Sequence, residues 1–252
     1  MNDLSYLVGA IVLLVLYYFL FYKQRTNTVT QDKEMQVELL EVSTPENQPE
    51  SNRFEEVLNF LNEPSEGNPN WECAKQLNST FIYRKKTENA SINVIKASTI
   101  IENTTVDVVS FLIWDVKERS KWDTLAKNLT TLESISLNHD LIRFEVDSPM
   151  PALVAPREFL QYRLWKKEGD SIAMVMWSEE KPEIPVPAGF TRAETVYAGY
   201  LITTEGSNVR LVLIINNDMK GNIPPKLINT MAPQKSMEWI KKLAAACKQK
   251  AG

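Results

Sequence analysis

The chain has 252 residues, of which 44% are hydrophobic, and its formal net charge is −4 at pH 7. An acidic chain is repelled by phosphate backbones, so this charge argues against a nucleic-acid partner. The two cysteines, Cys73 and Cys247, are far apart and form no CxxC pair, which leaves neither a disulfide framework nor a cysteine zinc site. The composition is that of an ordinary folded domain with no metal.

The first apolar run, residues 4–22, carries no charged side chain. At ~1.5 Å per residue, its length approaches the thickness of a bilayer core. Asp3 precedes the run, whereas Lys23 and Arg25 follow it, which is the reverse of a signal peptide. We therefore predict an N-terminal transmembrane anchor with its flanks, residues 1–25, in a single-pass membrane protein.

The charges beside the anchor also predict its orientation. Lys and Arg accumulate on the cytosolic side of membrane spans, which places the rest of the chain in the cytosol. Four Asn-x-Ser/Thr patterns leave a lumenal orientation open as the alternative, because they fit the glycosylation acceptor; they begin at Asn78, Asn89, Asn103 and Asn128. Such short patterns arise by chance, so the cytosol is expected, with the anchor in the endoplasmic reticulum or another endomembrane.

A polar segment, residues 26–52, follows the anchor. It is rich in Gln, Glu, Thr and Asn and contains Pro45 and Pro49, so it cannot bury enough apolar surface to fold. As a flexible linker it would span ~30 Å on average. The folded domain is expected over residues 53–252.

The domain's elements follow from hydrophobic periodicity. Asn52 is the predicted N-cap of a first helix, residues 105–114 form a second helix that 115–123 extends, and residues 224–248 form the last helix. Strand-like segments occupy residues 79–86, 91–101, 129–137, 141–147, 157–166, 171–178, 192–204 and 209–216. Segregated helices and consecutive strands predict an α+β fold with an antiparallel sheet.

The last helix has one apolar face, formed by Ile228, Met231, Ala232, Trp239, Ile240, Leu243 and Cys247. Pro233 interrupts this face and should kink the helix or divide it in two. The face alone is more typical of a helix packed on a core than of one that moves.

The sequence contains no motif of a common enzyme class. GxSxG, the Walker loop, HExxH and GxGxxG are absent, and the single histidine, His139, lies in a polar Asn-His-Asp stretch where we expect it to be solvated. We therefore expect neither catalysis nor a cofactor.

Four segments, in register over the whole domain, resemble the START family of lipid-transfer domains. The most specific is Asp-Met-Lys-Gly-Asn-Ile-Pro before the last helix; the segments are residues 111–123, 156–165, 189–200 and 218–229. The resemblance implies a helix-grip fold, in which a curved antiparallel sheet surrounds a long C-terminal helix and one lipid-sized cavity. One departure is Arg157-Glu158, where the family usually has Arg-Asp.

The resemblance also implies where a lipid binds. On the strand 157–166, Phe159, Gln161, Arg163 and Trp165 share one face. In the family, an arginine matching Arg163 points into the cavity and pairs with an acid on the preceding strand, here most similar to Glu145. The predicted lipid-binding residues are Glu145, Phe159, Gln161, Arg163, Leu211, Leu213, Ile215, Ile228, Met231 and Trp239.

The loop 148–156 is unusually apolar. Loops are normally polar, so an apolar loop indicates contact with a bilayer or a plug over an apolar site. We predict that this loop separates from the last helix to admit a lipid, with gate residues Met150, Leu153, Val154 and Pro233.

The expected function is therefore binding of one lipid, a sterol or a phospholipid, and its transfer between membranes near the anchor. The alternative is a lipid-sensing module that regulates a protein partner without net transfer. A helix-grip enzyme is a third, disfavoured reading. A phosphatidylcholine headgroup would require aromatic rings around its ammonium, and the available aromatics are Tyr162, Trp165, Trp177, Tyr197 and Tyr200.

Overall fold

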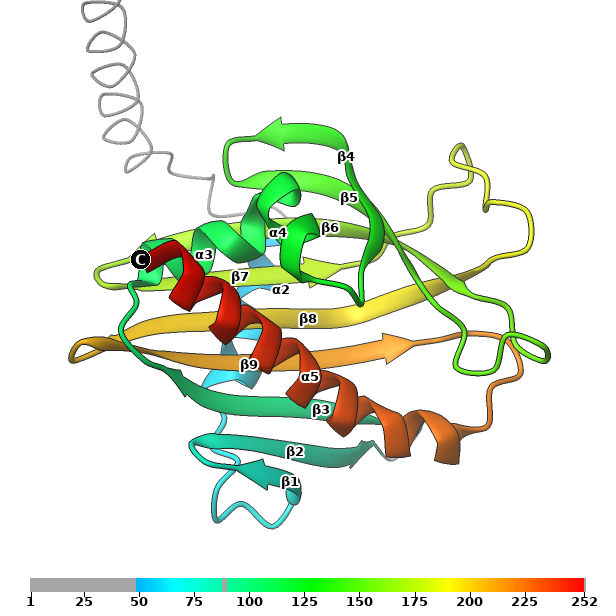
Figure 1. Ribbon diagram of the computed structural model, residues 1–252. Coiled ribbons are helices and arrows are strands. Elements are labelled where there is room, and N and C mark those ends of the chain that lie inside the picture. The colour runs from blue at the N-terminus through cyan, green and yellow to red at the C-terminus, as the bar shows by residue number, and fades with distance from the viewer. Residues whose placement is uncertain (1–48, 88–89, 252) are drawn as a thin grey trace, which may run out of the picture. The chain divides into compact units, whose positions relative to one another are not determined.

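The computed structural model describes residues 49–87 and 90–251, which form one antiparallel sheet with helices on both faces (Figure 1). The predicted anchor, and the predicted linker up to residue 48, lie outside the described residues. Within the described part, no helix combines the length and the hydrophobicity of a membrane span.

The order of helices and strands agrees with the α+β prediction. The elements are α2 (Pro49–Asn62), β1 (Glu72–Leu77), β2 (Thr80–Thr87), β3 (Ala90–Ile101), α3 (Val106–Trp114), α4 (Val116–Trp122), β4 (Lys127–Ser136), β5 (His139–Val146), β6 (Arg157–Glu168), β7 (Ser171–Trp177), β8 (Thr191–Glu205), β9 (Asn208–Asp218) and α5 (Pro225–Ala251).

The nine strands of the described residues form one sheet in the order β1-β2-β3-β9-β8-β7-β6-β5-β4. The last strand, β9, therefore lies between β3 and β8, in the middle of the sheet. The first residues of β6 also pair with β8 in parallel, from Arg157 opposite Thr191 to Phe159 opposite Ala193. This extra pairing is possible because β7 ends at Trp177 and leaves room between its neighbours.

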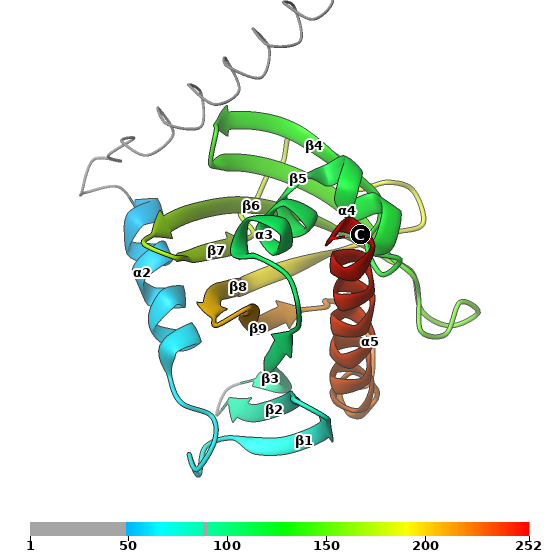
Figure 2. The same ribbon diagram turned by 60° about the vertical axis from the view of Figure 1, so that its left-hand side comes forward.

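The two faces of the sheet carry different helices, with α2 on one side and α5 on the other (Figure 2). We call the side of α3, α4 and α5 the inner face, and the side of α2 the outer face. Hydrophobic clusters fill both faces, so β7 is buried on both sides and reads as a nearly continuous apolar run. The first eight residues of β6 are also buried, although Arg157, Glu158, Gln161 and Arg163 are among them. All three clusters lie between Phe54 and Cys247, so a fragment of residues 46–252 contains the whole core.

Asp115 divides the predicted second helix into α3 and α4. Its backbone is extended, with φ −67° and ψ 117°, and it caps both helices. The Asp115 N–H donates to the Phe111 carbonyl (3.0 Å), and its Oδ1 accepts from the Glu118 N–H (2.8 Å). A short acidic side chain that bonds the backbone favours such caps over the middle of a helix.

The last helix is continuous from Pro225 to Ala251, so Pro233 does not divide it in two, and the alternative, a kink at Pro233, stays a prediction. Proline removes only one backbone donor, whereas packing of the apolar face holds the turns that follow. Met237, Trp239 and Ile240 are buried in the inner cluster there. The first helix also begins earlier than predicted, at Pro49 and not after Asn52.

One strand, β1, was missed by the periodicity. It is a short edge strand whose residues are almost all exposed, so its sequence lacks the apolar alternation of a half-buried strand. The turn from β1 to β2 places Asn78 in the left-handed region at φ 51°, which asparagine tolerates better than most residues.

Candidate functional site

The inner face holds a buried polar cluster under α5. We define the inner polar cluster as Arg119 of α4, Asp123 at the C-cap of α4, Asp140 of β5, Arg163 of β6 and Tyr200 of β8, all of which are buried. Charged groups are rarely buried without partners, so their arrangement decides what this interior can bind.

Arg163 and Asp140 form a two-point ion pair. They are direct partners across β6 and β5, and the Nε–Oδ1 and Nη2–Oδ2 distances are 2.8 and 2.6 Å. Arg163 Nη1 donates to the Trp114 carbonyl at 3.0 Å, and the guanidinium lies 4.2 Å from the Trp114 ring centroid. Burial lowers the pKa of Arg163, while Asp140 favours its charged form. Each guanidinium nitrogen of Arg163 therefore has a partner within the protein.

The predicted pairing of Arg163 with Glu145 is wrong. Glu145 lies opposite Glu158, five residues beyond Asp140 on the same strand, and its Oε2 accepts from Asn128 Nδ2 at 2.6 Å. Side chains alternate along a strand, so an odd separation places Glu145 and Asp140 on opposite faces. Glu145 thus belongs to the other face of β5.

Arg119 and Asp123 form the second pair, at i and i+4, with Arg119 on α4 and Asp123 at its C-cap. Arg119 Nε donates to Asp123 Oδ2 at 2.9 Å, and Trp239 Nε1 of α5 donates to the same oxygen at 2.9 Å. Asp123 therefore connects α4 to α5 inside the core. Arg119 Nη1 is buried and has no hydrogen-bond partner among the described residues.

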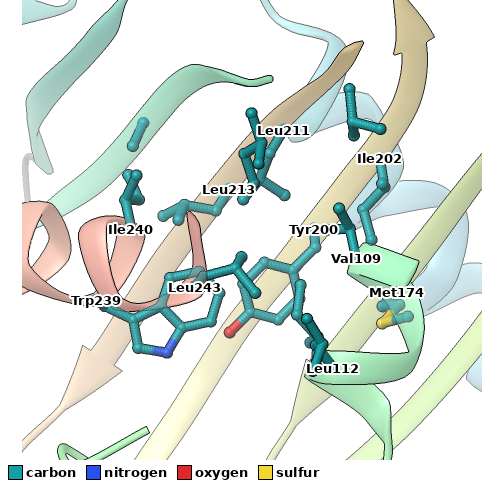
Figure 3. Close-up of a cluster of buried hydrophobic side chains, with 14 of the residues drawn as sticks. Val109, Leu112, Met174, Tyr200, Ile202, Leu211, Leu213, Trp239, Ile240 and Leu243 are labelled. Carbon is teal, nitrogen blue, oxygen red and sulfur yellow. The ribbon is translucent and has the colours of Figure 1, made fainter. Parts of the chain in front are cut away.

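Aromatic rings lie beside this second pair, and Figure 3 shows two of them, Tyr200 and Trp239, among the aliphatic side chains of the inner cluster. The ring of Tyr200 stacks on Trp239, with centroids 5.3 Å apart, and Trp122 contacts Trp239 edge-on, also at 5.3 Å. Burial raises the pKa of Tyr200, so its hydroxyl stays protonated. The surrounding wall is aliphatic and comprises Val109, Leu112, Met174, Ile202, Leu211, Leu213, Ile240 and Leu243.

Several predicted lipid-binding residues do lie on the inner face. Leu211, Leu213 and Trp239 belong to the inner cluster, and Ile215 packs against it. Ile228 and Met231 are half-buried in the first turns of α5.

The predicted residues Phe159 and Gln161 lie on the same face of β6 as Arg163, nearer the start of the strand. Phe159 stacks on Phe144 in a third cluster, with centroids 4.9 Å apart. Gln161 Nε2 donates to Thr195 Oγ1 at 2.8 Å. Glu145 alone among the predicted site residues lies on the other face.

The five candidate headgroup aromatics are divided between the faces. Tyr162 and Trp177 stack on the outer face beside His139, and Tyr197 stacks on Phe60 of α2. Only Trp165 and Tyr200 remain on the inner side. His139 is 8% exposed, so its predicted solvation is wrong, and burial lowers its pKa.

The loop 148–156 combines exposed and buried apolar residues. Leu153 is 81% exposed, whereas Val154 is buried and Met150 half-buried. The N–H groups of Leu153 and Val154 both donate to the Met150 carbonyl, at 2.9 Å each.

Arg157 ties the end of this loop to the turn before α5. Its Nε and Nη2 donate to the carbonyls of Met219 (2.9 Å) and Lys220 (2.7 Å), and its Nη1 donates to that of Ala155. The loop and the start of α5 are thereby coupled, while Pro233 is buried further along the helix. Separation of the loop from α5 stays a prediction.

A family model for the START domain matches residues 51–251, which covers nearly all of the described chain. The chain belongs to the START domain family. This START domain is 25% identical over 154 residues to the mitochondrial steroidogenic acute regulatory protein of Danio rerio, covering 60% of this chain and 54% of that protein. The chain thus spans about half the length of the first relatives it matches.

Other relatives match the START domain more completely. The phosphatidylcholine transfer protein of Bos taurus is 22% identical over 200 residues, 77% of this chain and 92% of that protein. Among solved structures, human StAR-related lipid transfer protein 5 superposes with a TM-score of 0.72 at 20% identity, covering 80% of this chain and 98% of that one. Human STARD10 gives 0.70 at 18%, covering 83% of each chain. These structures confirm the helix-grip fold.

Proposed function

We propose that this START domain binds one lipid between the inner face and α5 and transfers it between nearby membranes, without chemistry or a cofactor. Membership of the family supports lipid binding, and the names of relatives describe transfer of phosphatidylcholine and steroidogenic regulation. The ligand class proposed is a sterol or a phospholipid.

The observation that carries the proposal is the free donor of Arg119. A buried donor without a partner costs about 1–3 kcal/mol. Among the described residues, Arg119 Nη1 is such a donor, and aliphatic and aromatic side chains line the interior around the inner polar cluster. An oxygen at the polar end of a lipid would satisfy it, while the acyl or ring portion would contact the apolar wall. Lipid binding thus explains a group that folding alone leaves unsatisfied.

The charge balance of the site favours a lipid whose polar end carries no net charge. Arg119 is neutralised by Asp123, and Arg163 by Asp140. A hydroxyl or carbonyl oxygen, or the phosphate of a zwitterionic headgroup, fits this balance better than a net anion. In this assignment Arg119 contacts the lipid, and Arg163 holds β5, β6 and α3 together around it.

A lipid reaches Arg119 only if the surrounding elements move. Trp239 of α5 packs directly on the inner polar cluster and donates to Asp123. The loop 148–156 is connected through Arg157 to the turn before α5. Outward movement of the loop and the first turns of α5 would open the interior, with Leu153 in contact with the bilayer.

The proposed location is the cytosolic face of an endomembrane, with residues 1–25 as anchor. Asn78, Asn103 and Asn128 occupy the left-handed region, with φ of 51°, 52° and 49°. Asparagine is favoured there for backbone reasons, so these glycosylation patterns need no glycan to explain them. An unchanged gel mobility of the cell-expressed chain after N-glycosidase treatment is expected; a shift would place the domain in the lumen.

Native mass spectrometry of the 46–252 fragment tests lipid binding directly, by weighing the lipid that co-purifies. The decisive variant is Arg119→Met with Asp123→Asn, which removes both charges but keeps an acceptor for Trp239. It should lose most of the bound lipid. The matched control, Arg163→Met with Asp140→Asn, removes the pair whose guanidinium is fully satisfied and should keep more lipid. A larger loss of bound lipid in the control than in the Arg119 variant would assign the lipid contact to Arg163.

A liposome-to-liposome assay separates transfer from the alternative function. A fragment that loads lipid and moves it from donor to acceptor vesicles is a transfer protein. Loading without any transfer would support a lipid-sensing module. No co-purifying or added lipid at all would refute both.

A further inference from the structure

The solvent side of α5 carries a positive charge that lipid binding does not explain. The helix contains six lysines and one acidic residue, Glu238, whereas the chain as a whole has a formal net charge of −4. A charge of opposite sign, gathered on one helix of an acidic protein, points to an anionic partner.

Most of this charge is not neutralised within the protein. Lys235 and Lys242 share the single carboxylate of Glu238, at 3.0 and 2.8 Å. Lys226, Lys241 and Lys248 are exposed, and none of them forms an ion pair with another residue of the described chain.

Helix α4 extends the charged surface at the far end of α5. Lys250 pairs with Glu118 at 3.6 Å, and Lys242 Nζ donates to Thr124 Oγ1 just after α4. Lys117 and Lys121 of α4 are also exposed, and Lys121 pairs with Glu118 at 2.6 Å. We define the lysine face as Lys117 and Lys121 of α4 with Lys226, Lys235, Lys241, Lys242, Lys248 and Lys250 of α5.

Apolar side chains lie at both ends of this region. Phe111 of α3 is 43% exposed, and Lys250 Nζ lies 5.1 Å from its ring centroid. At the other end, Arg157 joins the loop of Leu153 to the turn before α5. Basic residues flanked by exposed apolar groups are typical of surfaces that lie in a membrane interface.

We infer that the lysine face docks on a membrane surface rich in anionic lipids and lays α5 along it. Figure 2 shows α5 on the opposite side of the sheet from α2, so docking would present the inner side to the bilayer. Phosphates of nucleic acid would use the lysines but not Phe111 or Leu153, which favours a bilayer over a nucleic acid. This inference rests on the proposed lipid transfer. Helix α5 must move to admit or release a lipid, and docking places this helix against the membrane.

Co-sedimentation of the 46–252 fragment with vesicles tests the inference. Vesicles of phosphatidylcholine alone are compared with vesicles that also contain about 30 mol% phosphatidylserine, in which each nearby lysine strengthens binding roughly fivefold. We expect binding to the anionic vesicles that weakens as salt is raised. Lys241→Gln with Lys248→Gln should reduce it at least about tenfold, whereas Lys241→Arg with Lys248→Arg should preserve it.

The matched control is Asn52→Glu with Asn59→Glu, at two exposed positions of α2 on the outer face. It makes the same change in net charge and should leave vesicle binding nearly unchanged. Equal binding to both kinds of vesicle, or an equal loss in the control, would overturn the inference. So would retention of a duplex oligonucleotide as tight as that of the anionic vesicles at the same salt. Lipid loading of each variant, weighed by native mass spectrometry, is measured separately, so a failure of docking is distinct from a failure of lipid binding.

Discussion

Asp140 and Arg163 face each other across β5 and β6 and close a two-point ion pair in the interior, 2.6 Å apart at their nearest atoms. The pair also reaches α3 through the Trp114 carbonyl, so one guanidinium joins two strands and a helix. Because both groups are buried, neither charge has water to replace a lost partner.

Asp140→Asn or Arg163→Met alone should therefore destabilise the domain strongly. Removing one member of a buried pair leaves an uncompensated charge and costs about 3–5 kcal/mol. The double variant should lose less than the sum of the two single losses, as measured by urea unfolding in a double-mutant cycle. Strict additivity would mean that the two groups do not interact.

Leu153→Asp should slow lipid transfer between vesicles without changing stability. The side chain is 81% exposed, so the folded protein loses little, but a leucine that enters a bilayer interface contributes enough for a loss of roughly tenfold. Leu137→Asp, at a 59% exposed position in the turn before β5, is the control and should transfer normally. Equal transfer rates in the two variants would exclude a membrane role for the loop tip.

Gly199→Val should loosen the packing of α2 on the outer face. A Cβ at Gly199 would lie 2.9 Å from Leu61 Cδ1 and 2.9 Å from Val57 Cγ1, so these side chains, or the helix that carries them, must shift. Overpacking of this kind costs about 1–3 kcal/mol. Thermal unfolding should show the loss, and Leu61→Ala in the same chain should recover part of it; further loss in the double variant would contradict the contact.

Stability should fall as the pH drops below about 6.5 because of His139. Burial lowers the pKa of His139 from its ordinary 6.5, so the unfolded chain binds the proton first. The stabilisation is present above that pH and is lost as acid protonates the imidazole. The free energy of unfolding, measured with urea at pH 7.5 and at pH 5.5, should differ less between the two pH values for His139→Gln than for the unchanged chain. Equal differences would show that other groups carry the effect.

The positions of most elements could be predicted from the sequence. Eight of the nine strands and the long last helix were found because apolar residues recur with a period that matches their local structure. β1 was missed because an exposed edge strand has no such pattern. The division at Asp115 was missed because the two helices follow each other directly, so a single capping aspartate reads as a charged surface residue of one longer helix.

The candidate site was predicted only in part. Alternation on β6 predicted that Phe159, Gln161 and Arg163 share one face of the strand, and in the structure all three lie on the inner face. The partner of Arg163 could not be found in this way, because register between β5 and β6 decides which acid lies opposite. Arg119 and Asp123 had a visible i, i+4 spacing, but their burial depends on α5 lying over α4.

The sequence by itself determined the apolar run at residues 4–22, the α+β order and the START resemblance, since each is a property of neighbouring residues or of motifs in order. Only the tertiary structure decided that Asp140 neutralises Arg163, that Arg119 Nη1 has no hydrogen-bond partner among the described residues, and that most lysines of α5 are exposed. The physical reason is that hydrogen bonds and charges act through space over a few ångströms. Residues 116 positions apart, such as Asp123 and Trp239, meet only when the sheet and its helices close around them.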